Sequence, residues 1–209
     1  MSAELRHVGL NLGDTDEAAH RQAEQAVFGF WVFLMSDAVI FALLFATYGT
    51  MQHATFSAPS AANEFKIGSA FLETLILLTS SFTFGMTSIS MKYGQARSRA
   101  GLLAWMTVTL SLGLAFIGLE LHDFASMFGD AAYPTRSGFL SAFFALVPLH
   151  GLHVLAASLW LIVMMVQVLT VGLDARVKIN ILRLGLFWHF LDIVWIAIFS
   201  VVYLEGLIR

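Results

Sequence analysis

The amino-acid sequence predicts an all-α membrane protein built as one bundle of five transmembrane helices. Two observations come from composition: 58% of the 209 residues are hydrophobic, and only 12% are charged. Soluble domains carry about 45–50% apolar and about 25% charged residues, so a soluble fold of this length could not bury so much apolar surface. The third observation is that the apolar residues gather in five long runs.

A helix needs about 20 mostly apolar residues to cross a hydrocarbon core of about 30 Å, and each run reaches that length. The first, residues 28–50, opens on FGFWVFLM. The second and third, 67–91 and 101–122, are separated by a short basic stretch. The fourth, 138–171, is long enough to tilt. The fifth, 182–207, follows the polar run DARVKIN, and together the five make up a membrane domain of residues 28–209.

Residues 1–27 are polar and acid-rich, and they predict a cytoplasmic tail with a short helix capped near Asp14 or Thr15. A signal peptide would need a basic start and a short apolar core, which this segment lacks. The sequence contains no cysteine, so disulfides and thiolate metal ligands are excluded. A net charge of −3 without a basic stripe gives no indication of nucleic-acid binding.

Lysine and arginine predict the orientation, because basic residues translocate poorly across the cytoplasmic membrane. Three basic residues would lie outside: Lys66, Arg136 and Arg209. Eight would lie inside, in the tail and in two loops: Arg6, Arg21, Lys92, Arg97, Arg99, Arg176, Lys178 and Arg183. The N-terminus is therefore predicted in the cytoplasm and the C-terminus in the periplasm.

Seven ionisable residues fall inside the predicted spans, where each acid costs roughly 2.5–3.5 kcal/mol at a helix centre and usually has a protein partner. Counting about 1.5 Å of rise per residue from the predicted helix starts divides them into two layers. The cytoplasmic layer holds Asp37, His189 and Asp192, and the outer layer holds Glu73, Glu120, His150 and His153.

Two of these groups have spacings that suit metal ligation. HGLHV and WHFLD each place two side chains at i and i+3 on one helical face, and imidazole and carboxylate are ligands for zinc or iron. The predicted separation of roughly 15 Å in depth is too large for one ion to bind both pairs. Hydrogen bonding between helices is therefore favoured over metal ligation, although two-residue sites stay open.

The roles of the buried acids also leave alternatives open. Asp37 is either a proton-binding carboxyl or an acid bonded to Ser36, His189 or Asp192. Glu73 and Glu120 are interpreted as interhelical or interfacial acids, with a transport pathway as the alternative. Neither a catalytic residue nor a metal ligand is predicted in this chain.

Three long segments resemble subunit III of the haem-copper respiratory oxidases, most closely that of the cytochrome bo-type ubiquinol oxidases. They are FGFWVFLMSDAVIFALLFATYGT (28–50), RSGFLSAFFALVPLHGLHV (136–154) and LFWHFLDIVWIAIFSVVYLEG (186–206). FLETLILLTSSFTFGM and LAFIGLELHDF occur at the matching places between them. The resemblance thus covers nearly everything from residue 28 onward.

The resemblance implies a non-catalytic subunit of a bacterial inner-membrane oxidase, in contact with subunits I, II and IV and with membrane lipid. Haems, copper and the quinol site would belong to subunit I, while this chain would support assembly, bind phospholipid and sustain proton uptake. Asp37 falls at the family's intramembrane acid, a carboxyl reactive toward hydrophobic carbodiimides in some relatives. Three alternatives remain: a cytochrome c oxidase subunit III, an independent ion or proton transporter, and a metal- or haem-bearing membrane enzyme.

Overall fold

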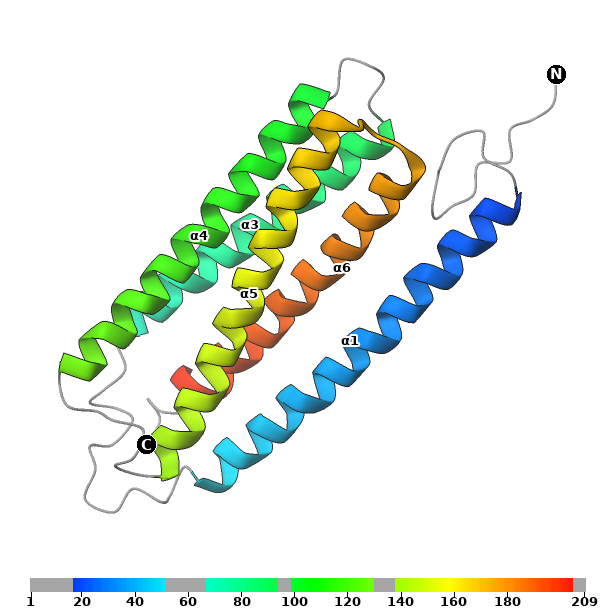
Figure 1. Ribbon diagram of the computed structural model, residues 1–209. Helices are drawn as coiled ribbons and strands as arrows, with labels where there is room; N and C mark the ends of the chain where they lie inside the picture. The colour runs from blue at the N-terminus through cyan, green and yellow to red at the C-terminus, as the bar shows by residue number, and fades with distance from the viewer. Residues whose placement is uncertain (1–16, 52–66, 94–98, 130–137, 205–209) are drawn as a thin grey trace.

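The computed structural model describes residues 17–51, 67–93, 99–129 and 138–204, and in these ranges every regular element is helical (Figure 1). Five helices are long and apolar enough to cross a membrane, which confirms the predicted fold class. In chain order the elements are α1 (Glu17–Met51), α3 (Ile67–Tyr93), α4 (Arg99–Gly129), α5 (Gly138–Thr170), α6 (Ala175–Ile198) and the π-helical turn η3 (Phe199–Leu204).

Three helices extend well beyond the spans predicted from hydropathy. Helix α1 begins at Glu17 instead of near residue 28, α6 begins at Ala175 instead of near 182, and α4 continues to Gly129. Hydropathy detects only the part of a helix that lies among lipid tails, whereas polar helix ends remain helical in the headgroup region. The predicted short tail helix is therefore the first part of α1, and its predicted caps lie outside the described residues.

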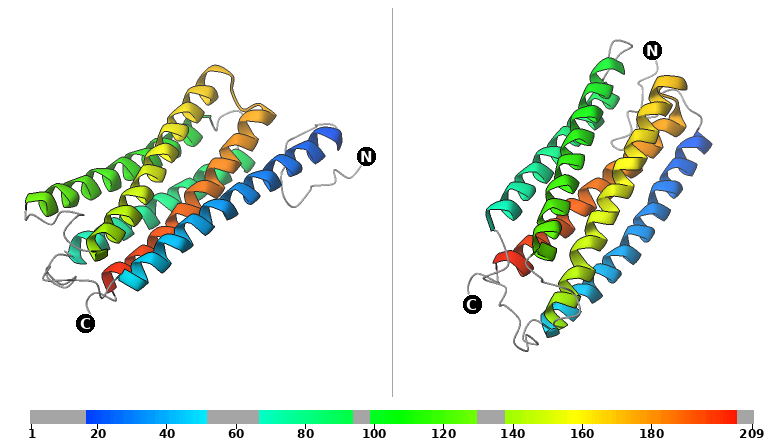
Figure 2. Two further views of the ribbon diagram at one scale, coloured as in Figure 1. Left: turned by 60° about the horizontal axis from the view of Figure 1, so that its bottom comes forward. Right: turned by 60° about the vertical axis from the view of Figure 1, so that its left-hand side comes forward.

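The helices α3, α4, α5 and α6 form a ring in which each contacts the next and α6 closes back on α3. Helix α1 lies outside this ring and packs along α5 and α6, as the views in Figures 1 and 2 show. Of the five helices, α6 is the most buried and α1 the least. The ring therefore carries the core, and α1 covers only one edge of it.

Two tryptophans of α6 connect that helix to α3. Trp188 Nε1 donates to Ser80 Oγ at 3.0 Å, and Trp195 Nε1 donates to Thr74 Oγ1 at 3.1 Å. Both indoles are almost fully buried. An indole that brings an N–H group into the membrane needs an acceptor there, and the hydroxyls of α3 supply it.

The turn between α5 and α6 depends on a glycine. The N–H groups of Val171 and Gly172 both donate to the carbonyl of Gln167, and these two hydrogen bonds close the C-terminal end of α5. Gly172 has a φ of 88°. This left-handed conformation is accessible to glycine without the Cβ clash that other residues meet. The resulting short connection places α6 antiparallel beside α5.

Candidate functional site

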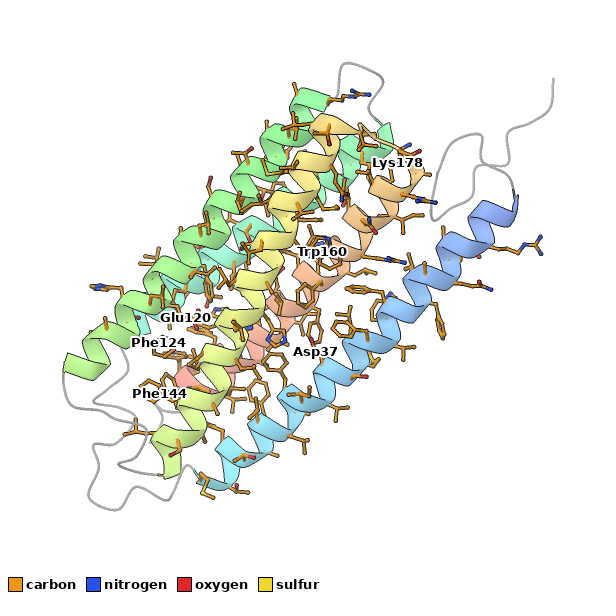
Figure 3. All side chains as sticks on the ribbon, in the orientation of Figure 1. Asp37, Glu120, Phe124, Phe144, Trp160 and Lys178 are labelled. Atoms are coloured by element: carbon orange, nitrogen blue, oxygen red, sulfur yellow. The ribbon has the colours of Figure 1, made fainter. Side chains whose placement is uncertain are left out.

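Asp37 of α1 and His153 of α5 form a pair that connects the outer helix to the ring. Asp37 points from α1 toward α5 and α6 (Figure 3), and its Oδ2 lies 3.4 Å from His153 Nε2. The other ring nitrogen, Nδ1, lies 2.7 Å from the carbonyl oxygen of Leu149. Because a carbonyl can only accept, Nδ1 donates this hydrogen bond and carries a proton, while Nε2 is the nitrogen that faces the carboxyl.

This pair contradicts the predicted division into two layers, which placed Asp37 with His189 and Asp192 and put His153 on the other side. The layers were wrong because the depth was counted from helix starts that were several residues late in α1 and α6.

Aromatic contacts show that HGLHV of α5 and WHFLD of α6 lie at similar depths in the bundle. The His153 ring packs against Phe187, with centroids 6.3 Å apart, and Phe187 lies only two residues before His189. The His150 ring packs against Trp195, with centroids 5.3 Å apart, and Trp195 lies three residues after Asp192. The predicted separation of these segments by roughly 15 Å is therefore also wrong.

His189 and Asp192 do meet on one face of α6, as their spacing predicts, and a serine of α3 joins them. His189 Nδ1 lies 2.8 Å from Ser81 Oγ and 3.6 Å from Asp192 Oδ2. The side chain of Asp192 is 7% exposed, but that of His189 is 46% exposed. His189 thus contacts the bundle through one edge of its ring and leaves the other edge at the surface.

The arrangement of Ser81, His189 and Asp192 differs from a nucleophilic triad. In a triad the serine and the acid contact opposite nitrogens of the imidazole, so that the ring can pass a proton between them. Here both groups face Nδ1. The three side chains therefore support one another without activating the serine.

Glu73, Glu120 and His150 are the most deeply buried of the seven ionisable residues, and all three belong to helices of the ring. Their exposed fractions are 2%, 5% and 0%. The Glu120 carboxyl lies between α4 and α5 (Figure 3), directly over Gly151, and the Glu73 carboxyl lies within electrostatic range of Glu120 and Asp123. Among the described residues, Glu73 Oε1, Glu120 Oε1 and both nitrogens of His150 have no hydrogen-bond partner.

His150 lies in an aromatic cage, with ring centroids 5.9 Å from Phe116 and 6.4 Å from Phe41 in addition to the Trp195 contact. His153, three residues on, turns instead to Asp37. In the ranges that the structure describes, no three histidine, aspartate or glutamate side chains are grouped so that they could hold a metal ion.

The sequence did not lead us to the hydroxyl partners on α3. Thr74 and Ser80 accept hydrogen bonds from α6, and Ser81 forms one with it. A signal was present in LETLILLTSSFT, where hydroxyls recur within an apolar helix. Such residues can hydrogen-bond across helices in a membrane. Thr74 and Ser80 also donate to carbonyls of their own helix, so the sequence alone does not identify the partner.

A double-mutant cycle tests the Asp37–His153 pair. Asp37→Ala and His153→Ala should each lower the free energy of unfolding in detergent by about 1–3 kcal/mol, because the remaining partner loses its contact while still largely enclosed. The double variant should fall short of the sum by at least about 0.5 kcal/mol. Asp37→Ala combined with His189→Ala is the control and should be additive. If Asp37 were coupled to His189 but not to His153, the division into two layers predicted from sequence would be correct after all.

Comparison with known proteins agrees with this architecture. The sequence profile of the family described as cytochrome c oxidase subunit III matches residues 12–207. Cytochrome bo(3) ubiquinol oxidase subunit 3 of Pseudomonas aeruginosa is 47% identical over 195 residues, covering 93% of this chain and 92% of the relative.

Two further relatives extend the range of similarity. The subunit of the same name from Pseudomonas putida is 43% identical over 90% of each chain. A probable quinol oxidase subunit 3 of Staphylococcus epidermidis is 34% identical over 93% of this chain and 96% of the relative. With a family match over nearly the whole chain and a bundle of five membrane helices, this protein belongs to the cytochrome c oxidase subunit III family.

Proposed function

We propose that this chain is the non-catalytic subunit III of a terminal ubiquinol oxidase in a bacterial cytoplasmic membrane. The observation that carries the proposal is the similarity to the Pseudomonas aeruginosa ubiquinol oxidase subunit over nearly the full length of both chains. A subunit of this family works beside other oxidase subunits. We assign those partners as subunit I, which would hold the haems, copper and quinol site, together with subunits II and IV.

The polar groups inside the bundle support a structural role. Asp37 faces His153, Asp192 faces His189 and Ser81, and the Trp188 and Trp195 indoles donate to α3 hydroxyls. Such contacts between helices stabilise a membrane bundle by about 0.6 kcal/mol each on average. A bundle held in this way could support the assembly and lipid environment of a partner that performs the chemistry.

A cytochrome c oxidase is the second candidate for the complex, because the matching family profile is described by that name. The relatives at 47% and 43% identity are both named as ubiquinol oxidase subunits, and they favour quinol as the electron donor. Oxygen uptake by the purified complex with ubiquinol or with reduced cytochrome c distinguishes the two.

The proposal predicts how loss of Asp192 affects turnover. Asp192→Ala leaves His189 and Ser81 without their acid, so the subunit should be held less firmly and activity should decline during sustained turnover. The initial rate of oxygen uptake with quinol, normalised to intact complex, should stay close to that of the unaltered oxidase. A stable, fully assembled Asp192→Ala complex with no initial activity would place this residue in the chemistry instead.

The proposal also includes an orientation. Within the described helices, Lys and Arg are confined to one end of the bundle, at residues 21, 92, 99, 176, 178 and 183. The positive-inside rule places that end in the cytoplasm. A reporter fused at Ser2 should therefore be active inside the cytoplasmic membrane, and one fused after Arg209 outside it. The opposite pattern would overturn this orientation.

A further inference from the structure

His189 is the most exposed of the seven ionisable residues inside the spans. Its side chain is 46% exposed, compared with 22% for His153 and less for the others. Ionisable groups at membrane depth usually face protein or a water-filled cavity, because lipid tails offer no hydrogen-bond partner. An imidazole at the lipid-facing surface is therefore unexpected for a bundle that is complete by itself.

His189 belongs to an exposed stripe that runs along α6 and into η3. Ile193 is 67% exposed and Ile196 is 43% exposed, and together with Ser200 they follow His189 at i+4, i+7 and i+11. On the neighbouring α3, Phe82 is 67% exposed beside Ser81. We call this surface, made of His189, Ile193, Ile196, Ser200 and Phe82, the His189 face.

The neighbouring helix leaves room for close approach at this face. Gly85 lies one turn after Ser81 on α3, and a Cβ placed on it would meet nothing within 4 Å. Small residues on membrane helices let another helix approach the backbone closely. At Gly85, one turn from the serine that contacts His189, a transmembrane helix could therefore pack closely against α3.

The contacts of His189 involve one ring nitrogen, Nδ1, and leave the other, Nε2, for a partner outside the bundle. Nδ1 lies 2.8 Å from Ser81 Oγ and 3.6 Å from the Asp192 carboxyl, so a proton on Nδ1 serves both groups when the carboxyl is ionised. In this tautomer Nε2 holds a lone pair. Nε2 has no hydrogen-bond partner among the described residues, and beside an ionised Asp192 carboxyl a partner for it must be a donor.

We propose that the His189 face is the surface against which a transmembrane helix of another oxidase subunit packs, with a donor side chain of that helix bonded to His189 Nε2. The proposal rests on the proposed function, since it requires an oxidase partner. A hydroxyl, amide or indole N–H at the depth of His189 would complete the network that Ser81 and Asp192 begin. The apolar side chains of the face would be buried in the same contact.

Two amide variants, each of which reaches the position of one ring nitrogen, test the hydrogen bond in the intact oxidase. The amide of asparagine reaches about as far as Nδ1, so His189→Asn keeps the contact with Ser81 and Asp192 but loses the outer end of the ring. The amide of glutamine reaches about as far as Nε2. His189→Asn should release the subunit from the complex roughly threefold to tenfold faster in mild detergent, and His189→Gln should restore much of the retention.

The thermal stability of the detached chain is the control for the two variants. It should be nearly the same for His189→Asn and the unaltered chain, which separates loss of docking from loss of folding. Retention of His189→Asn at the unaltered level would overturn the proposal, as would equal release of the asparagine and glutamine variants.

Photocrosslinking locates the partner directly. A photoreactive amino acid at Ile193 or Phe82 should form adducts with another oxidase subunit in membranes that contain the assembled complex. Adducts at both positions with lipid alone, or with a second copy of this chain, would overturn the proposal while leaving the proposed function intact. Failure of the tagged chain to copurify with any oxidase subunit would instead remove the proposed function, and this proposal with it.

Discussion

Replacing Trp188 with alanine is expected to lower the free energy of unfolding of the chain in detergent by about 3–5 kcal/mol. The indole is 2% exposed, donates to Ser80 Oγ at 3.0 Å and stacks with Phe84 at a centroid distance of 6.0 Å. It also lies against Gly113 of α4. Its removal would open a cavity where α3, α4 and α6 meet, and the rigid helices could close it only partly.

Trp31→Ala is the matched control for this prediction. Trp31 lies on α1 and is 46% exposed, so its truncation should change the free energy of unfolding of the detached chain by less than about 1 kcal/mol. Equal effects of the two substitutions would mean that Trp188 is not packed in the core of the ring.

The second large effect is expected at Gly151, where even one added methyl group has no space. A Cβ on this residue would overlap the carboxylate of Glu120, which is itself 5% exposed. Gly151→Ala should therefore lower the free energy of unfolding by about 1–3 kcal/mol, because either α4 and α5 separate or the buried carboxyl leaves its place. Thermal denaturation of the purified chain measures this loss.

Gly118→Ala is the control, since a Cβ on Gly118 of α4 meets nothing within 4 Å. This change should be neutral or stabilising by up to about 1 kcal/mol, because alanine has the higher helix propensity. If Gly151→Ala were equally harmless, the Glu120 carboxyl would not be held in its place over Gly151.

The number of membrane helices could be predicted from sequence because it follows from run length and composition alone. Each backbone polar group in a membrane must bond within its own segment, so an apolar run of sufficient length has few alternatives to a helix. The positions of the helix ends were predicted less accurately. Residues 17–27 are polar and still belong to α1, because a helix can leave the membrane without unwinding.

The ionisable residues were predicted to lie inside the bundle, but the partner of Asp37 was not correctly predicted. Asp37 was assigned to a layer with His189 and instead faces His153. When depth is counted along a helix, any error in the predicted first residue shifts the depth of every later residue. The count also gives no information on the direction in which a side chain points. The WHFLD contact was predictable because both of its residues lie on one helix at i and i+3.

Purification of the tagged chain after mild detergent extraction tests most directly whether it is a non-catalytic oxidase subunit. The preparation should contain other oxidase subunits, show a haem Soret band and take up oxygen with ubiquinol. The chain separated from those subunits should retain neither haem nor copper. Purification without any haem-bearing partner would contradict the account, and so would a Soret band that remains with the isolated chain and is lost on changing His150 or His189.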